Sequence, residues 1–166
     1  NPSGTWNGTT VDSLCQAIEE QWPDPSLPLD VCEPRLKLSG LMFHTNGDEE
    51  KLVDAMWHGI DEGEVDRVWI PDHECCSGTL AVADDEIVID EHAASEMGIG
   101  LGDTVTLGAG HGTMNYTVVG IGYHSNHLYF AQEGVLLPAE PGTFVTGYLS
   151  DGGLERLANL TAGSAN

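Results

Sequence analysis

One stretch of the sequence, Glu86–Tyr123, constrains the fold most, because its local signals agree on a strand, a short helix and a hairpin. Ile87–Ile89 is a run of β-branched residues, which favours a strand. Asp90 can accept hydrogen bonds from the free N–H groups at a helix start, and Gly98 can take the left-handed conformation that ends one. The sequence therefore predicts a strand followed by a helix over Glu91–Met97.

Two alternating segments follow this helix. Val105 and Leu107 alternate with threonines, and a second alternation begins at Tyr116, beyond the small residues of the AGHG sequence. Alternation on both sides of turn-forming residues predicts a β-hairpin. We expect Gly102 and Asp103 to form a tight turn that directs the first of these strands.

The same stretch resembles a known family. The sequence EIVIDEHAASEMGIGLGDTVTL, followed by YTVVGIG, is similar in order and spacing to the extracytoplasmic core domain of MacB/FtsX-type ABC transporter permeases. Weaker similarities lie in the same order at Pro34–Leu36, Gly59–Asp61 and Gly147–Leu160. The resemblance therefore covers most of the chain from about Val31 onward.

The resemblance implies a non-catalytic domain on the extracytoplasmic side of a cell membrane. Such a domain couples ATP-driven movement to the handling of a substrate or partner outside the membrane. The implied partners are an ABC ATPase, reached through membrane helices outside these residues, and a second permease copy or a periplasmic or extracellular protein. No cofactor, metal or catalytic residue is implied. The sequence itself has no apolar run of the ~18–20 residues that cross a bilayer, and no phosphate-binding loop.

Charge excludes some partners. Five basic and 27 acidic residues give a net charge of −22 over 166 residues. A protein that neutralises phosphates needs the opposite balance, so nucleic-acid binding and binding to an anionic membrane surface are excluded. We expect a solvated acidic surface of the kind that high salt screens, and no D-x-D-x-D-G calcium loop is present.

The predicted fold class is α+β, with mostly antiparallel strands and a few short helices. The resemblance implies a helix-and-strand lobe beside a β-rich lobe. We place the first lobe at about residues 1–79 and the second at about 80–150. A C-terminal helix and the end of the given chain occupy 151–166.

The remaining elements are predicted from periodicity. Val11–Trp22 has helical spacing, with Thr10 or Asp12 as its cap, and we expect one face to pack on a sheet. Residues 29–44 predict one bent or interrupted strand, with Pro34 at an edge or a break, and Asn46-Gly47 predicts a turn. Residues 49–60 fit a helix or a strand, and the resemblance favours the strand.

Four further elements complete the expected order. Residues 61–69 form a short acidic helix or turn, and residues 71–78 an irregular loop. Short strands are predicted at Val135–Leu137 and Thr143–Leu149. Asp151 is expected to cap a helix over Leu154–Leu160.

Four cysteines, Cys15, Cys32, Cys75 and Cys76, allow three pairings in an oxidising compartment. Because a bridge between neighbouring cysteines is strained, we expect a disulfide between Cys15 and Cys32. N-glycosylation sequons at positions 7, 115 and 159 fit a surface outside the cell.

A different class of protein remains open. His73, Cys75 and Cys76 lie in one loop, and His124 and His127 elsewhere add the residue types that bind zinc. The alternative is therefore a secreted, acidic metal-binding protein or hydrolase that uses this loop. Adjacent cysteines lack the two-to-four-residue spacing of structural zinc sites, and no G-x-S-x-G motif is present. We expect His124 and His127 to be polar residues of a loop at a strand end.

Overall fold

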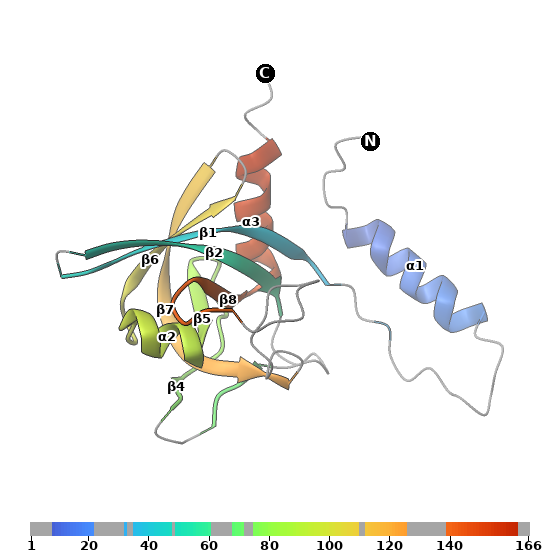
Figure 1. The fold of residues 1–166 in the computed structure, drawn as a ribbon. Coiled ribbons are helices and arrows are strands. Elements are labelled where there is room, and N and C mark those ends of the chain that lie inside the picture. Colours follow the sequence, from blue (N-terminus) through green and yellow to red (C-terminus); the bar gives the residue numbers. More distant parts are fainter. Residues whose placement is uncertain are drawn as a thin grey trace.

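The computed structural model describes residues 8–21, 32, 35–47, 49–60, 68–71, 75–109, 112–125 and 139–162. Within these residues the chain is mostly β, with three helices, in agreement with the α+β class predicted (Figure 1). In chain order the elements are α1 (Gly8–Gln21), β1 (Lys37–Asn46), β2 (Glu49–Gly59), β3 (Val68–Trp69), β4 (Ser77–Gly78), β5 (Glu86–Asp90), α2 (Glu91–Met97), β6 (Thr104–Ala109), β7 (Gly112–His124), β8 (Phe144–Leu149) and α3 (Asp151–Ala162).

Six strands close into a barrel in the order β7–β5–β8–β2–β1–β6, because β6 also pairs with β7. The short strands β3 and β4 both pair with β7. The pairs β5–β7 and β2–β8 are parallel, and the other pairings among the described residues are antiparallel. Closure leaves the barrel strands without free edges.

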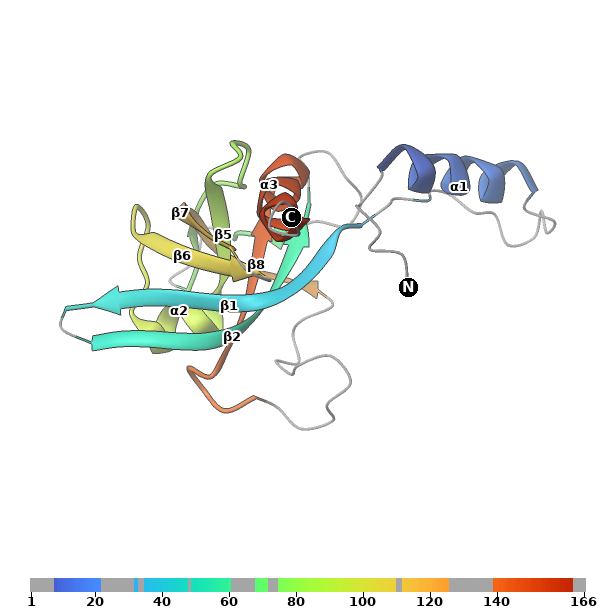
Figure 2. The same cartoon turned by 90° about the horizontal axis from the view of Figure 1, so that it is seen from above.

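The division into two lobes near residue 79 does not appear in the hydrogen bonding. β1 pairs with β6 and β2 pairs with β8, so strands from both sides of that position share one barrel. The β1–β2 hairpin turns at Gly47, which has φ 64°, and projects beyond the other barrel strands (Figure 2). This hairpin provides the surface described below.

Trp57 fills the barrel interior. Its side chain is fully buried on β2 and packs against two glycines on neighbouring strands. A Cβ atom at Gly147 would lie 2.8 Å from two carbons of the Trp57 ring, and one at Gly40 would lie 2.8 Å from its Nε1. The absence of side chains at these positions makes room for the indole ring.

The helices α2 and α3 complete the core from opposite sides of the barrel (Figure 1). Ala93 and Met97 of α2, and Leu154 and Leu157 of α3, are buried in the same apolar cluster as the barrel interior. The hydroxyl of Tyr116 on β7 donates a 2.9 Å hydrogen bond to the carbonyl of Gly153, which fixes the start of α3. Burial raises the pKa of Tyr116 to about 12 and keeps this donor protonated.

Asp90 connects the barrel to α2. One carboxylate oxygen accepts a 3.0 Å hydrogen bond from the N–H of Ala93 and caps the helix. The other accepts a 2.8 Å hydrogen bond from the N–H of Thr146 on β8. Burial raises the pKa of Asp90 to about 6, although both hydrogen bonds oppose this shift.

The prediction for the central stretch is confirmed. Asp90 is the N-cap of α2, Gly98 ends it in the left-handed conformation with φ 66°, and β6 and β7 form the predicted hairpin. The carboxylate of Asp103 accepts a 2.8 Å hydrogen bond from the N–H of Gly100 in the preceding turn. The choice of a strand for residues 49–60 is also confirmed by β2.

Several local predictions are wrong. α1 begins at Gly8, so Thr10 and Asp12 lie inside the helix and do not cap it. α1 also does not pack on the sheet: it lies beside the barrel, and 59% of the surface of Leu14 is exposed (Figures 1 and 2). Its apolar spacing predicts a helix but not what the helix contacts.

The structure also corrects the predicted bounds of several strands and the predicted cap of the last helix. β1 begins at Lys37 and continues to Asn46, beyond the predicted end at residue 44. β3 and β4 contribute short strands within segments predicted as a helix or turn and as a loop. Asp151 is the first residue of α3, and the hydroxyl of Ser150 accepts the capping hydrogen bond from the N–H of Gly153 at 3.1 Å. The predicted elements at residues 61–67, 72–74 and 135–137 lie outside the described residues.

Replacing Gly147 with alanine tests the packing of Trp57. The new methyl group would overlap the indole ring and lie 2.9 Å from Cδ1 of Ile87. We expect Gly147→Ala to lower the free energy of unfolding by about 1–3 kcal/mol, as overpacked cores do. Chemical denaturation of both proteins measures this change in the free energy of unfolding. Gly100→Ala is the matched control, because its nearest neighbour would be 3.7 Å away, and an equal loss in both variants would contradict the packing argument.

The buried carboxyl of Asp90 predicts a pH dependence. Its pKa rises from the ordinary 3.8 to about 6 on folding, so the folded protein holds this proton more tightly than the unfolded chain. The Asp90 contribution to stability therefore falls as pH rises from about 4 to about 6 and is constant above that range. The expected change is on the order of 2–3 kcal/mol, at 1.36 kcal/mol per pKa unit.

Comparison with Asp90→Asn isolates this effect from the other acidic residues. Denaturation of both proteins at constant ionic strength from pH 4 to pH 7 should show the stability of the native protein falling relative to the variant. A difference that does not change with pH would mean that the folded protein does not hold the proton of Asp90.

Candidate functional site

An open groove lies over the outer face of the β1–β2 hairpin. It encloses about 600 Å³, and its lining residues are Phe43, His44, Thr45, Glu50, Lys51, Leu52, Thr106 and Thr113. Phe43 pairs with Leu52 across the hairpin and with Thr106 on β6. Because paired residues project to the same side of a sheet, the Phe43, Leu52 and Thr106 side chains share one face.

The groove is lined by both apolar and polar residues. Phe43 is 40% exposed and Leu52 is 56% exposed, although both are large apolar side chains on a regular sheet. Glu50 adds a carboxylate at the hairpin end, and Thr106 and Thr113 add hydroxyl groups. A surface that combines exposed apolar side chains with polar groups is typical of a binding site for another molecule.

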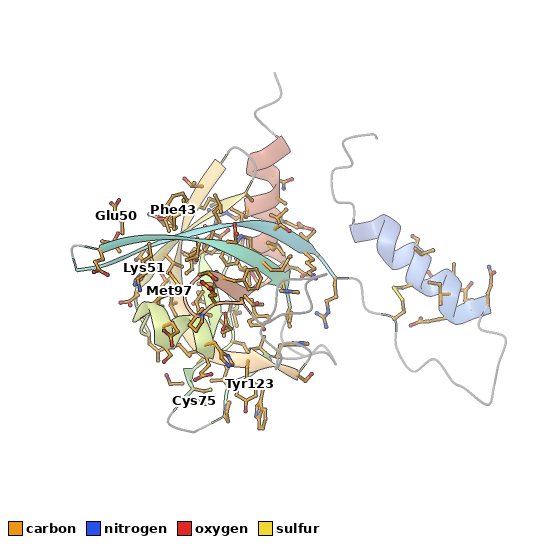
Figure 3. All side chains as sticks on the ribbon, in the orientation of Figure 1. Phe43, Glu50, Lys51, Cys75, Met97 and Tyr123 are labelled. Atoms are coloured by element: carbon orange, nitrogen blue, oxygen red, sulfur yellow. A yellow bond between two sulfur atoms is a disulfide. The ribbon has the colours of Figure 1, made fainter. Side chains whose placement is uncertain are left out.

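Lys51 positions the hairpin from the other face. Its ammonium group donates a 3.3 Å hydrogen bond to the carbonyl of Glu96 in the last turn of α2. A cation is favoured there by the negative end of the helix dipole. Phe43 and Glu50 lie on one side of the hairpin, and Lys51 lies on the side of α2 and Met97 (Figure 3).

A second cluster surrounds the paired thiols Cys75 and Cys76. Cys75 lies in a turn and is partly exposed, whereas Cys76 is buried, and both are free thiols. Figure 3 shows Cys75 together with Tyr123, well away from Phe43 and Glu50. Trp69 pairs with Tyr123 across β3 and β7, with their rings 5.1 Å apart in an edge-on arrangement.

The chemistry of this cluster does not favour nucleophilic catalysis. Burial, together with a hydrogen bond between the two thiols, raises the pKa of Cys76 to about 12. Desolvation and the neighbouring thiols raise the pKa of Tyr123 as well. The carboxylate of Glu91 adds to both shifts. A nucleophilic thiol needs a lowered pKa, so Cys76 is a neutral thiol at physiological pH.

The structure separates the other predicted site residues. Cys15 on α1 and Cys32 lie at disulfide distance and form the pair expected from the sequence. His124 is the last residue of β7 and not part of the loop after it; it is buried and stacks on Tyr148 with ring centroids 5.9 Å apart. His73 and His127 lie outside the described residues.

The described part of the chain holds no cluster of metal-binding side chains. No group of three or more histidine, cysteine, aspartate or glutamate residues there is placed to hold a metal ion. Among the same residues, no helix is both long and apolar enough to cross a membrane.

The groove was missed by sequence reasoning. Leu41, Met42 and Phe43 form a continuous apolar run, so alternation could not separate the buried side chain of Met42 from its two exposed neighbours. The one available signal was apolar character on both faces of a strand that leads into a tight turn. Tyr123 and Trp69 were also missed, because strand pairing brings them together and toward the thiols.

A scan against protein-family models and a search of curated proteins found no match for this chain.

Counting thiols tests the disulfide. In denaturant without reductant we expect two free thiols, from Cys75 and Cys76, and four after reduction. Because α1 lies beside the barrel, the bridge between Cys15 on α1 and Cys32 lies outside the barrel core. We expect Cys15→Ser with Cys32→Ser to change the free energy of barrel unfolding by less than about 0.5 kcal/mol, below the ~2–4 kcal/mol of a bridge within a core. Four free thiols in the untreated protein would contradict the pairing.

Proposed function

We propose that this chain is a non-catalytic extracytoplasmic domain of a MacB/FtsX-type ABC transporter permease. It binds a partner or substrate outside the membrane and couples that binding to ATP-driven movement inside. The proposal assigns the ATPase and the membrane helices to other parts of the assembly. In it, α1 and its disulfide form a small lobe beside the β-rich barrel.

The resemblance supports the permease part of the proposal. Its central phrase corresponds to one continuous unit, β5–α2–β6–β7, in which the residues quoted have definite structural tasks. Asp90 caps α2, Gly98 ends it, and Asp103 closes the turn before β6. The phrase therefore specifies mainly a scaffold, and of its residues Thr106 also lines the groove.

The groove on the β1–β2 hairpin is the observation that carries the binding part of the proposal. The exposed Phe43–Leu52 pair offers apolar contact, while Glu50 and a chain charge of −22 favour a positively charged partner. We assign the groove to a protein segment that presents an apolar side chain flanked by lysine or arginine. A second copy of the same acidic domain fits this surface less well, because like charges repel.

Coupling requires an element with two arrangements. The β1–β2 hairpin is held to α2 by Lys51 through a hydrogen bond to the carbonyl of Glu96. Movement of α2 relative to the barrel would change the position of the hairpin and with it the groove. Partner binding and movement of the domain would then be linked.

Purification of the full-length protein from its own membranes tests the proposal. We expect it in the membrane fraction, accompanied by an ABC ATPase in comparable amount. A protein without an ATPase, with stoichiometric zinc that is lost in Cys75→Ser with Cys76→Ser, would contradict the proposal. That result would favour the alternative of a secreted metal-binding protein or hydrolase.

A photoreactive residue at position 52 of the full-length permease tests the groove. We expect cross-links in intact cells to an extracytoplasmic protein with a basic surface, reduced at least about tenfold by Phe43→Ser. Val82 is 65% exposed outside the groove and serves as the matched control position. Equal cross-linking from positions 52 and 82, or cross-links only to the same chain, would contradict this assignment.

A further inference from the structure

Cys75 and Cys76 are two free thiols at adjacent positions of the chain. Cys75 is partly exposed, Cys76 is 5% exposed, and the neighbouring Cys75 thiol helps to raise the pKa of Cys76. Among the described residues, no further histidine, cysteine, aspartate or glutamate completes a metal-binding group with them. The neighbouring groups are the phenol of Tyr123 and the carboxylate of Glu91.

The chain around this pair is held on β7. Ser77 and Gly78 pair with Ile121 and Gly120, and the N–H of Thr79 donates a 2.9 Å hydrogen bond to the carbonyl of Val119. The segment directly after the two cysteines is therefore fixed on the barrel, and the cysteines themselves are adjacent in the chain.

We propose that Cys75 and Cys76 are a reversible redox site that exchanges with small disulfide molecules to form a bond between adjacent cysteines. This inference does not depend on the proposed function, because it rests on two free thiols at adjacent positions beside a paired strand. The ligand class is a low-molecular-weight disulfide, such as oxidised glutathione.

The reaction proceeds in two exchanges. The accessible Cys75, as the thiolate, attacks one sulfur of oxidised glutathione, which forms a mixed disulfide and releases one reduced glutathione. Cys76 then loses its proton and attacks the Cys75 sulfur, which releases the second reduced glutathione. Two protein thiols are oxidised and one glutathione disulfide is reduced to two thiols. The high pKa of Cys76, about 12, makes the second exchange the slower one near neutral pH.

The two cysteine pairs of the chain should differ in redox potential. Cys15 and Cys32 are 17 positions apart, so their bridge closes an ordinary loop. A bond between adjacent residues closes a small ring that includes the peptide group, and strained disulfides are the more easily reduced ones. The Cys75–Cys76 bond should therefore open under conditions that leave Cys15–Cys32 closed.

The acidic surface predicts which disulfides react fastest. Oxidised glutathione is an anion, and Glu91 and the net charge of −22 oppose its approach. Cystamine is a positively charged disulfide of similar reactivity. We expect cystamine to react several-fold faster at low salt, with the difference falling as salt screens the charges.

A redox titration of the protein tests the inference. The chain is equilibrated with mixtures of reduced and oxidised glutathione, alkylated and mapped by mass spectrometry. We expect Cys75 and Cys76 to lose both thiols together, with a mass decrease of two hydrogens. We expect this bond to open at a ratio of reduced to oxidised glutathione at least about 100-fold lower than Cys15–Cys32 requires.

Single variants separate the two steps. In Cys76→Ser we expect Cys75 to keep one glutathione as a stable mixed disulfide, whereas in Cys75→Ser the buried Cys76 should react at least about tenfold more slowly. If a variant fails to fold, the redox titration of the native protein still tests the inference, because it needs no variant. Stable glutathione adducts in the native protein, disulfide-linked dimers, no oxidation, or earlier opening of Cys15–Cys32 would each overturn the inference.

Discussion

At the end of β5 the chain leaves the barrel to begin α2, and a side chain takes over the hydrogen bonding of the strand. The carboxylate of Asp90 accepts from the N–H of Thr146 on β8, and it also caps α2 through the N–H of Ala93. One buried group thus satisfies a strand and a helix that would otherwise each carry a free donor. Its burial costs free energy, as the pKa of about 6 indicates.

The helix held by Asp90 lies between the two surfaces with functional interest. Glu91 in its first turn adds negative charge near the Cys76 thiol and Tyr123. Glu96 in its last turn accepts the hydrogen bond from Lys51 that holds the β1–β2 hairpin. A displacement of α2 would therefore move Glu91 relative to the Cys76 thiol and Glu96 relative to Lys51. This placement gives a physical route by which binding in the groove and the state of the thiol pair can influence each other.

The surfaces differ in what they can do. The groove combines exposed Phe43 and Leu52 with a carboxylate, which suits binding and offers no activated group for a reaction. The thiol pair is chemically reactive, but the high pKa of Cys76 makes it suited to slow exchange and not to rapid nucleophilic attack. A binding domain with a redox-sensitive surface fits both observations.

The sequence by itself determined the features that depend on neighbouring residues. It placed the cap at Asp90, the helix end at Gly98 and the β6–β7 hairpin, because these depend on backbone hydrogen bonds and turn conformations within a few residues. It also named Cys75 and Cys76 as candidate metal ligands, since thiol chemistry belongs to the side chains.

Only the tertiary structure decided which strands meet, because ladder partners far apart in the chain are chosen by the packing of the whole barrel. β2 pairs with β8 some 90 positions away, and this brings Gly147 opposite Trp57. The exposure of Phe43 and the position of α1 beside the barrel are likewise decided by tertiary packing. An apolar pattern in the sequence predicts that one face of a helix or strand can be buried. Whether another element covers that face is decided by the packing of the whole chain.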